Sequence, residues 1–292
     1  MDISEENAHS GFSKAKKGAT TYYLRTGLSD RFATSPESLF RAPAVGTVSG
    51  RREHKIVSAG GEKFVLRHYE HGGLLRFFTR DFYFIARRFL HELLTSQYAL
   101  SRGIPTPEVA ALRIRRSLFA YKADILTRFV EESSDLQKII RENFQAVGLA
   151  RKREVIDKCA ILIRRMHDCG ILHADLHIKN ILLSRRDGLL QPFLLDLDKA
   201  KILKSLSPRQ RMKNLFRLGR SLDKMGDACI ITERDKYRFF IKYLKAGEPL
   251  PIRKRAVVSQ FVRHRKIHSI WRRLTVCACR RAKGRSNKDG GA

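Results

Sequence analysis

One short stretch of the chain, Ile171 to Leu183, carries polar side chains whose types and spacing suit the transfer of a phosphoryl group. It reads ILHADLHIKNILL and places His173, Asp175 and Asn180 in the pattern H-x-D-x-x-x-x-N. A phosphoryl group in transfer is held mainly by positioning and by neutralisation of its charge, and one carboxylate must orient the attacking hydroxyl and accept its proton. We therefore predict that Asp175 is the catalytic base.

A second stretch supplies further acidic side chains. It reads LLDLDKA and places Asp196 and Asp198 directly after an apolar run. Mg²⁺ prefers oxygen ligands, and a protein commonly offers it one or two carboxylates and an amide oxygen. Asn180 and Asp196 fit this role, whereas Asp198 could bind a second cation or cap the next segment. Two predicted strands with a turn at Asp187 form a hairpin that brings Asn180 and Asp196 together, as in a kinase.

Three short strands are predicted ahead of these stretches, from Ala44 onward, with glycine-containing turns between them. The segment from Gly46 to Arg51 could cover nucleotide phosphates, because Gly46 and Gly50 leave room for backbone amides to approach. It lacks the G-x-G-x-x-G spacing, so an ordinary hairpin explains these glycines equally well.

A cation on the third strand and an acid on the next helix could complete a nucleotide site. In the run FVLR, Arg67 stands where the kinase motif V-A-I-K has its lysine, and Lys55 or Lys63 could take that role instead. The segment Asp81 to Ser101 has the apolar periodicity of a helix. Glu92 lies within this helix, where it could pair with the strand cation or remain a solvated charge.

The order of these elements predicts an α+β, protein-kinase-like fold with two lobes. We expect a small antiparallel β lobe with one helix over residues 21–130 and a larger, mainly helical lobe over residues 131–285, which includes a basic C-terminal segment. A polar stretch at residues 131–134 suits a hinge between the lobes. Residues 1–20 and 286–292 are expected to be flexible ends.

The charge of the chain is far from balanced. Its 59 Lys and Arg against 29 Asp and Glu give a formal net charge of +30, while 43% hydrophobic content is enough for a core. Such an excess implies a polyanionic partner, which could be nucleic acid, an anionic membrane surface or a phosphorylated glycolipid. Five cysteines without repeated spacing argue against a disulfide framework. With neither a signal peptide nor a long apolar run, we expect a cytoplasmic, non-integral protein.

Two segments concentrate this positive charge. Pro208 to Met225 reads as a helix with one apolar face and a heavily basic opposite face. Ile252 to Arg285 contains many Lys and Arg and no acid, with aromatic and aliphatic residues between them. This second segment could lie on an anionic leaflet or pack on the large lobe.

Several runs together resemble the 3-deoxy-D-manno-octulosonic acid (Kdo) kinases of the lipopolysaccharide kinase family. They are RHYEHGGLLRFF, YKADILTRFV, HADLHIKNILL, LLDLDKAKI and NLFRLGRSLDKM, which fall between Arg67 and Met225. The resemblance implies a protein-kinase-like fold and phosphorylation of Kdo on a lipid A precursor at its 4-hydroxyl, with ATP and Mg²⁺ as cofactors. It assigns the base to Asp175. It also implies Kdo-lipid A as acceptor, a peripheral place on the inner face of the inner membrane, and no specific nucleic acid.

Two positions depart from protein kinases and keep other acceptors open. Ala174 replaces the arginine that senses a phosphorylated activation loop, and His177 replaces the lysine that follows the catalytic aspartate. The H-x-D-x-H form is similar to aminoglycoside and choline phosphotransferases. The alternatives are therefore a heptose or other small-molecule kinase, a protein Ser/Thr kinase, and a catalytically inactive, basic nucleic-acid-binding protein.

Overall fold

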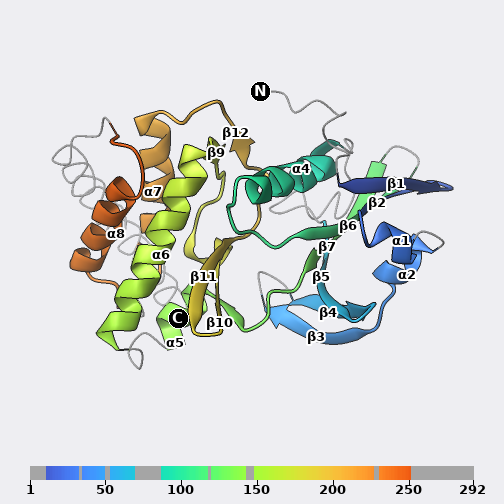
Figure 1. The fold of residues 1–292 in the computed structure, drawn as a ribbon, viewed down its shortest axis with the longest axis horizontal. Coiled ribbons are helices and arrows are strands. Elements are labelled where there is room, and N and C mark those ends of the chain that lie inside the picture. Colours follow the sequence, from blue (N-terminus) through green and yellow to red (C-terminus); the bar gives the residue numbers. More distant parts are fainter. Residues whose placement is uncertain are drawn as a thin grey trace, which may run out of the picture. The chain divides into compact units, whose positions relative to one another are not determined.

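Alternating apolar residues in the N-terminal part of the chain form a seven-stranded antiparallel sheet (Figure 1). The computed structural model describes residues 11–32, 35–49, 53–69, 87–117, 120–142, 148–226 and 230–250. The strands are β1 (Phe12–Lys17), β2 (Thr20–Arg25), β3 (Ala44–Ser49), β4 (Glu53–Ala59), β5 (Glu62–His68), β6 (Val109–Ser117) and β7 (Ala120–Arg128). Their order across the sheet is β1-β2-β6-β7-β5-β4-β3, and every neighbouring pair is antiparallel.

Both faces of this sheet are buried. Successive residues of a strand point to opposite faces, so Tyr23 packs with Phe89 and Leu93 of helix α4 (Arg87–Ser101), while its neighbour Tyr22 packs on the other face. That second face is covered by two short helices, α1 (Ser29–Phe32) and α2 (Pro36–Phe40). The sheet is therefore a rigid, doubly covered support for residues on β5 and α4.

The expected flexible segment over residues 1–20 is wrong for Phe12–Lys17, which form strand β1. This strand pairs with β2 along its whole length, with Phe12 opposite Arg25, and it buries Phe12 while its lysines face outward. The sequence FSKAKK contains one large apolar residue and three lysines, so its periodicity is weak. Lysines are typical of edge strands, where they discourage pairing with other chains.

Where the structure describes the C-terminal part, from residue 133 to residue 250 with gaps, it combines four helices with two small sheets. The helices are α5 (Leu136–Glu142), α6 (Leu149–Asp168), α7 (Pro208–Asp223) and α8 (Glu233–Lys245). One sheet has the order β11 (Leu189–Leu194), β10 (Ile181–Arg186), β8 (Ser133–Asp135), and the other pairs β12 (Lys201–Ile202) with β9 (Ile171–Leu172). A single 3₁₀ turn, η2 (Ile178–Asn180), precedes β10.

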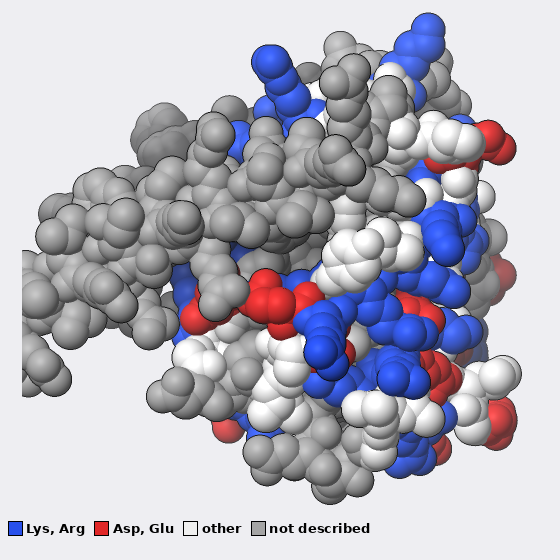
Figure 2. Space-filling model, turned by 90° about the vertical axis from the view of Figure 1, so that its left-hand side faces the viewer, with Lys and Arg blue, Asp and Glu red and all other residues white. Residues whose placement is uncertain are grey.

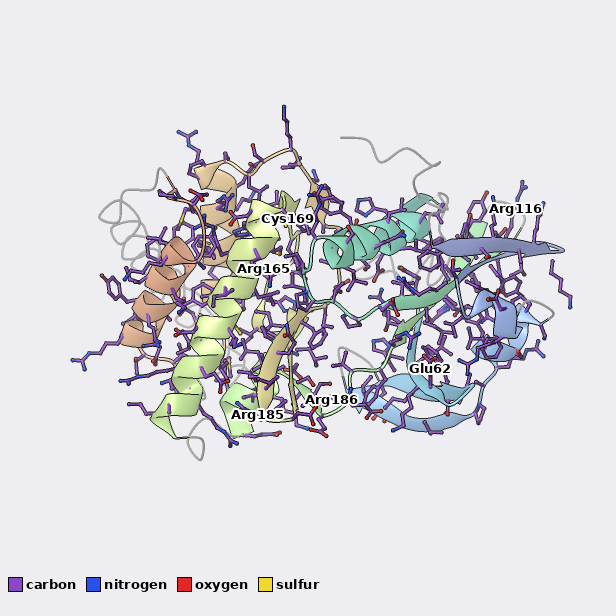
Figure 3. The ribbon with its side chains drawn as sticks, in the orientation of Figure 1. Glu62, Arg116, Arg165, Cys169, Arg185 and Arg186 are labelled. Atoms are coloured by element: carbon purple, nitrogen blue, oxygen red, sulfur yellow. The ribbon has the colours of Figure 1, made fainter. Side chains whose placement is uncertain are left out.

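The predicted hairpin is present as β10 and β11. Asp187 and Gly188 both have positive φ (52° and 75°) between the paired ends Arg186 and Leu189, as a two-residue hairpin loop of this kind requires. Arg185 of β10 donates to Glu154 of α6 at 2.8 Å and so ties the hairpin to that helix (Figure 3).

Helix α6 ends at the point where the chain turns toward the catalytic stretch. Gly170 has φ +74° and its carbonyl accepts from the Leu203 amide at 2.9 Å. A Cβ at this glycine would lie 2.0 Å from the Leu203 oxygen. Only glycine fits both the backbone angle and the close approach of the two chains.

The chain divides into two units, Met1–Glu248 and Pro249–Ala292. The predicted basic segment Ile252 to Arg285 and the tail 286–292 lie outside the described residues. No helix in the described part combines the length and the apolar composition needed to cross a bilayer.

Candidate active site

His173 joins the two stretches that the sequence analysis singled out. Its Nδ1 accepts from the Asp175 amide at 3.1 Å, so Nε2 carries the proton and donates to the Leu195 carbonyl at 3.0 Å. Burial lowers the pKa of His173 and keeps the ring neutral. One imidazole thus fixes the backbone of Asp175 and of the residue immediately before Asp196.

Asn180 adds two further links between the same stretches. Its side-chain amide donates to the Asp175 carbonyl at 2.9 Å, and its own carbonyl accepts from the Leu195 amide at 2.9 Å. The first bond uses the nitrogen of the Asn180 side chain, so Oδ1 remains as an acceptor. Asn180 is 9% exposed, whereas the Asp175 side chain is 48% exposed. The structure therefore presents the Asp175 carboxylate to solvent from a backbone that is firmly bonded.

Helix α7 holds this loop from behind. Asn214 accepts from the His173 amide at 3.2 Å and donates to the His173 carbonyl at 2.9 Å. About two turns further along the same side of the helix, Ser221 Oγ accepts from the Ile178 amide at 3.1 Å. The helix itself starts at a capping box formed by Ser207 and Gln210.

A second buried histidine extends the support to α8. His167 of α6 donates from Nε2 to Asn214 Oδ1 at 3.3 Å, and its Nδ1 accepts from the Tyr243 hydroxyl at 2.8 Å. Burial lowers the pKa of His167 to about 3. The sequence analysis missed Asn214, His167 and Tyr243 as site residues; their one signal was that Asn214 opens the run NLFRLGRSLDKM.

Arg67 meets the loop from the sheet. Its guanidinium forms an ion pair with Glu92 of α4 and lies 3.5 Å from Asp196 Oδ1. The Tyr69 hydroxyl donates to the other oxygen of Glu92. Burial opposes the charge of Arg67, but the neighbouring Glu92, Tyr69 and Asp196 raise its pKa above the usual value. The structure brings Arg67, Glu92 and Asp196 together, as the sequence analysis expected.

Asp196 has an unusual backbone. Its φ is +58°, in the left-handed region that non-glycine residues rarely adopt, which costs about 1–3 kcal/mol. The surrounding bonds to Leu195 hold the chain in this conformation. The consequence is a turn that presents the Asp196 carboxylate to Arg67.

Asp198 has a different environment. Its carboxylate pairs with Arg88 of α4 at 3.0 Å, and its carbonyl lies 3.2 Å from His91 Nδ1. Burial and the nearby charge of Asp196 raise the pKa of Asp198. Asp198 therefore fastens the end of the loop to α4, and a role as a ligand for a second cation stays a prediction.

The β3–β4 edge contributes less to the cluster. Gly46 lies within β3, next to a bulge after Ala44, and not in a loop. Lys55 is exposed on β4, and neither residue has a hydrogen bond or ion pair with the Arg67 cluster in the part of the chain that is described. Gly50 lies outside the described residues. Lys63 pairs with Glu131 at 3.1 Å and so is occupied at the expected hinge.

The donor set fits a magnesium ion in part. The Asp196 carboxylate and Asn180 Oδ1 are hard oxygen donors, the type that Mg²⁺ prefers when it keeps several other ligands. No group of three or more His, Cys, Asp or Glu side chains is arranged to hold a metal within residues 11–250, gaps excepted. Any Mg²⁺ at these two side chains would therefore need water or phosphate oxygens as well.

Comparisons with known proteins agree on one family. The family model described as lipopolysaccharide kinase (Kdo/WaaP) matches residues 40–243. The 3-deoxy-D-manno-octulosonic acid kinase of Photobacterium damsela subsp. piscicida is 29% identical over 209 residues, covering 70% of this chain and 82% of that protein. The kinase of the same name from Vibrio cholerae serotype O1 is 30% identical over 186 residues, covering 62% and 74%.

A solved structure supports the fold. The structure titled "WaaP in complex with acyl carrier protein" aligns with a TM-score of 0.59 at 19% identity and covers 83% of this chain and 97% of that chain. At this identity the likeness concerns the fold alone. The expected mixed fold of helices and antiparallel sheet is confirmed.

Proposed function

We propose, since the chain belongs to the lipopolysaccharide kinase (Kdo/WaaP) family of ATP-dependent kinases, that it transfers the γ-phosphate of ATP to the 4-hydroxyl of Kdo on Kdo-lipid A. The observation that carries the proposal is the single hydrogen-bonded unit formed by His173, Asp175, Asn180 and Leu195, which meets Arg67 through Asp196. In this proposal the half-exposed Asp175 carboxylate, Asn180 Oδ1 and the Arg67 guanidinium would surround one site.

Within this proposal the residues have distinct roles. Asp175 accepts the proton of the attacking hydroxyl while the hydroxyl oxygen bonds to the γ-phosphorus and the bond to the ADP oxygen breaks. Asn180 and Asp196 would hold Mg²⁺, which when bound neutralises phosphate charge. Arg67, oriented by Glu92, would bind phosphate oxygens through its fork of donors.

We further propose that the two parts of the fold act as kinase lobes. Residues 21–130 would form the small lobe and residues 131–285 the large lobe, with ATP between them. The hinge would lie at residues 131–134, where the Glu131 carbonyl accepts from the Ser184 hydroxyl at 2.8 Å. Just ahead of it the amide of Phe129 donates to the Lys63 carbonyl at 2.9 Å. Peripheral attachment to the inner face of the inner membrane would bring the enzyme to its glycolipid acceptor.

The acceptor is the part of the proposal with the strongest competitor. His177 lies 3.4 Å from an oxygen of Asp175, next to the position that an acceptor hydroxyl would take, and it gives the loop its likeness to small-molecule kinases. Phosphorylation of a heptose, or of a small soluble alcohol, is therefore the second candidate.

One partition experiment tests these candidates. The purified full chain would be given γ-labelled ATP with Kdo-lipid A, a heptose-containing core glycolipid, an aminoglycoside and a mixture of proteins, each in a separate reaction. We expect label in Kdo-lipid A, and acid hydrolysis should release it as Kdo phosphorylated at the 4-position. Label in the heptose, the aminoglycoside or the proteins, with none in Kdo-lipid A, would refute the proposed acceptor but not the kinase chemistry.

A further inference from the structure

Helix α7 carries a row of cations on the side opposite its buried residues. The row comprises Arg209, Lys213, Arg217, Arg220 and Lys224, the last being the C-cap residue. With 3.6 residues per turn these five positions fall within an arc of about 80° and extend for about 22 Å. All are exposed except Arg217, which is half-buried. We call this set the α7 cation row.

The row has no acidic counterpart among the residues that the structure describes. Between Lys199 and Lys224 the sequence contains nine Lys and Arg and a single acid, Asp223. Asp223 pairs with Lys236 of α8 at 2.8 Å, not with the row. Within the described residues, none of the five cations forms an ion pair or a hydrogen bond with a carboxylate.

Helices α6 and α8 show the contrasting arrangement. Their acids lie between their cations, and many of these groups pair across the two helices. The pairs between the two helices are Arg238 and Lys242 with Asp157, and Lys152 with Asp235, while Lys236 pairs with Glu233 within α8. In Figure 2, blue and red atoms lie side by side over the described surface on the side where α8 lies in Figure 1. All three helices carry more cations than acids, and α7 differs in that its exposed cations follow one side of the helix with no acid among them.

The composition of the row favours one kind of anionic partner. Protein partners are commonly anchored by apolar or aromatic side chains, and single-stranded nucleic acid by aromatic stacking. The large exposed hydrophobic residues of the described part are Val45, Leu149, Leu189 and Tyr237, and none lies on α7. A line of point charges without anchors suits the diffuse negative charge of lipid headgroups.

The basic C-terminal segment cannot neutralise the row. From Ile252 to Arg285 the sequence contains no Asp or Glu. These residues therefore offer the row no carboxylate, and like charges repel.

The flank of the same helix, about 80–100° round from the middle of the row, holds the catalytic loop through Asn214 and Ser221. An α-helix with its side chains is about 10–12 Å across. A surface bound by the α7 cation row would therefore lie about one helix diameter from the loop that carries Asp175.

We propose that the α7 cation row docks the enzyme onto the anionic headgroups of a lipid bilayer and so holds the catalytic loop beside the membrane face. The use of such docking rests on the proposed glycolipid acceptor, but the docking itself does not require catalysis. A binding measurement without ATP therefore separates a failure of this inference from a failure of the proposed function.

The test uses sedimentation of the full chain with vesicles. One set contains equal parts phosphatidylglycerol and phosphatidylcholine, and the other phosphatidylcholine alone. The test variant changes all five cations of the row to glutamine (Arg209→Gln, Lys213→Gln, Arg217→Gln, Arg220→Gln, Lys224→Gln). We expect the partition coefficient onto the anionic vesicles to fall about 100-fold, and added salt to weaken binding of the parent chain.

A matched control removes the same charge from α6 and α8. It changes five exposed cations there (Arg151→Gln, Arg153→Gln, Lys158→Gln, Arg234→Gln, Lys245→Gln). We expect the partition coefficient of this variant onto the anionic vesicles to fall less than about tenfold, because salt screens charges that do not face the bilayer. Circular dichroism and thermal melting of both variants check that α7 still folds.

Three results would overturn the inference. One is a folded row variant that binds anionic vesicles as the parent does. Another is an equal loss in both variants, which would assign binding to net charge. The third is a parent chain that does not bind the vesicles but binds duplex DNA or an acidic carrier protein, with the row variant failing to bind it. This result would identify a different class of partner.

Discussion

The catalytic loop and the β3–β4 edge of the sheet differ in how firmly they are held. In the loop, the backbone groups of His173, Asp175 and Asn180 bond to buried side chains or to the neighbouring stretch. On β3 the residues are mostly exposed, with Val45 at 55%, and its partner Lys55 is free of ion pairs in the described structure. Of these two regions, the loop that would perform the chemistry is the one held by buried polar side chains. The expected phosphate-covering edge is held by the antiparallel pairing of β3 with β4 and by the packing of Val57 in the core.

The largest expected effect is at Asp175. If the loop exists to present this carboxylate, Asp175→Asn should lower kcat by about a factor of 1,000 with a small change in the Kd for ATP, because it removes the proton acceptor alone. Kinase assays and nucleotide titration would measure both.

The matched control for that change is Asp187→Asn in the hairpin loop. Asp187 is exposed and has positive φ, which asparagine also tolerates. This variant should keep the parent activity. Normal turnover by Asp175→Asn would remove the assignment of the base and with it the contrast between the two regions.

The second largest effect is expected on substitution of Arg67. Arg67→Met leaves Glu92, which is 5% exposed, as a buried carboxylate without its cation. We expect the free energy of unfolding to fall by about 3 kcal/mol. We also expect the KM for ATP to rise. Urea unfolding and steady-state kinetics would measure these changes.

Arg128→Met provides the comparison for Arg67. Arg128 also pairs with two acids, Glu62 and Glu108, but its side chain is 42% exposed. Its loss should cost less than about 1 kcal/mol, because exposed ion pairs are screened by water. Equal destabilisation by both variants would show that the cluster at Arg67 is an ordinary surface pair.

The two buried histidines predict a pH dependence of stability. Burial lowers the pKa of His167 to about 3 and lowers that of His173, whereas an unfolded histidine titrates near pH 6.5. Below about pH 6.5 the unfolded chain therefore binds more protons than the folded one, so stability falls as pH falls. His167 should contribute about 1.4 kcal/mol per pH unit in this window, and His173 acts in the same direction.

The measurement is urea unfolding at pH 7 and pH 5 for the parent and for His167→Gln. The variant should show the shallower loss between the two pH values, while His91→Gln, at an exposed position, should match the parent. An unchanged slope in His167→Gln would contradict the buried, neutral histidine that supports Asn214.

The smallest effect on activity is expected at the β3–β4 edge. Lys55→Met removes an exposed cation, so the KM for ATP should rise less than about fivefold, in line with a charge interaction at a solvated surface. A much larger rise in KM would mean that Lys55 contacts the nucleotide directly. The β3–β4 edge would then contribute to the site as the catalytic loop does.

The sequence was most informative where chemistry constrains spacing. The pattern of His173, Asp175 and Asn180, the following Asp196, and the pairing of Arg67 with Glu92 could all be anticipated, because each role needs one residue type at one distance along the chain. The Asp187-Gly188 turn was readable for the same reason, since few residue pairs tolerate positive φ twice.

The residues that hold the catalytic loop from distant parts of the sequence could not be predicted from spacing. Asn214, His167 and Tyr243 come from three different helices, and only the packing of α6 against α7 and α8 brings them to the loop. Each reads locally as an ordinary helical residue. Strand β1 was missed because its pairing with β2, and not its own apolar content, makes it a strand.

The close approach of the Gly170 and Leu203 backbones limits which substitutions residue 170 can accept. Cys169, its neighbour, is half-buried, whereas even a methyl group at residue 170 would collide with the main chain at Leu203. A library randomised at both codons should return many residues at the first and glycine alone at the second. The chain therefore enters the catalytic loop through a position at which we expect only glycine to be tolerated.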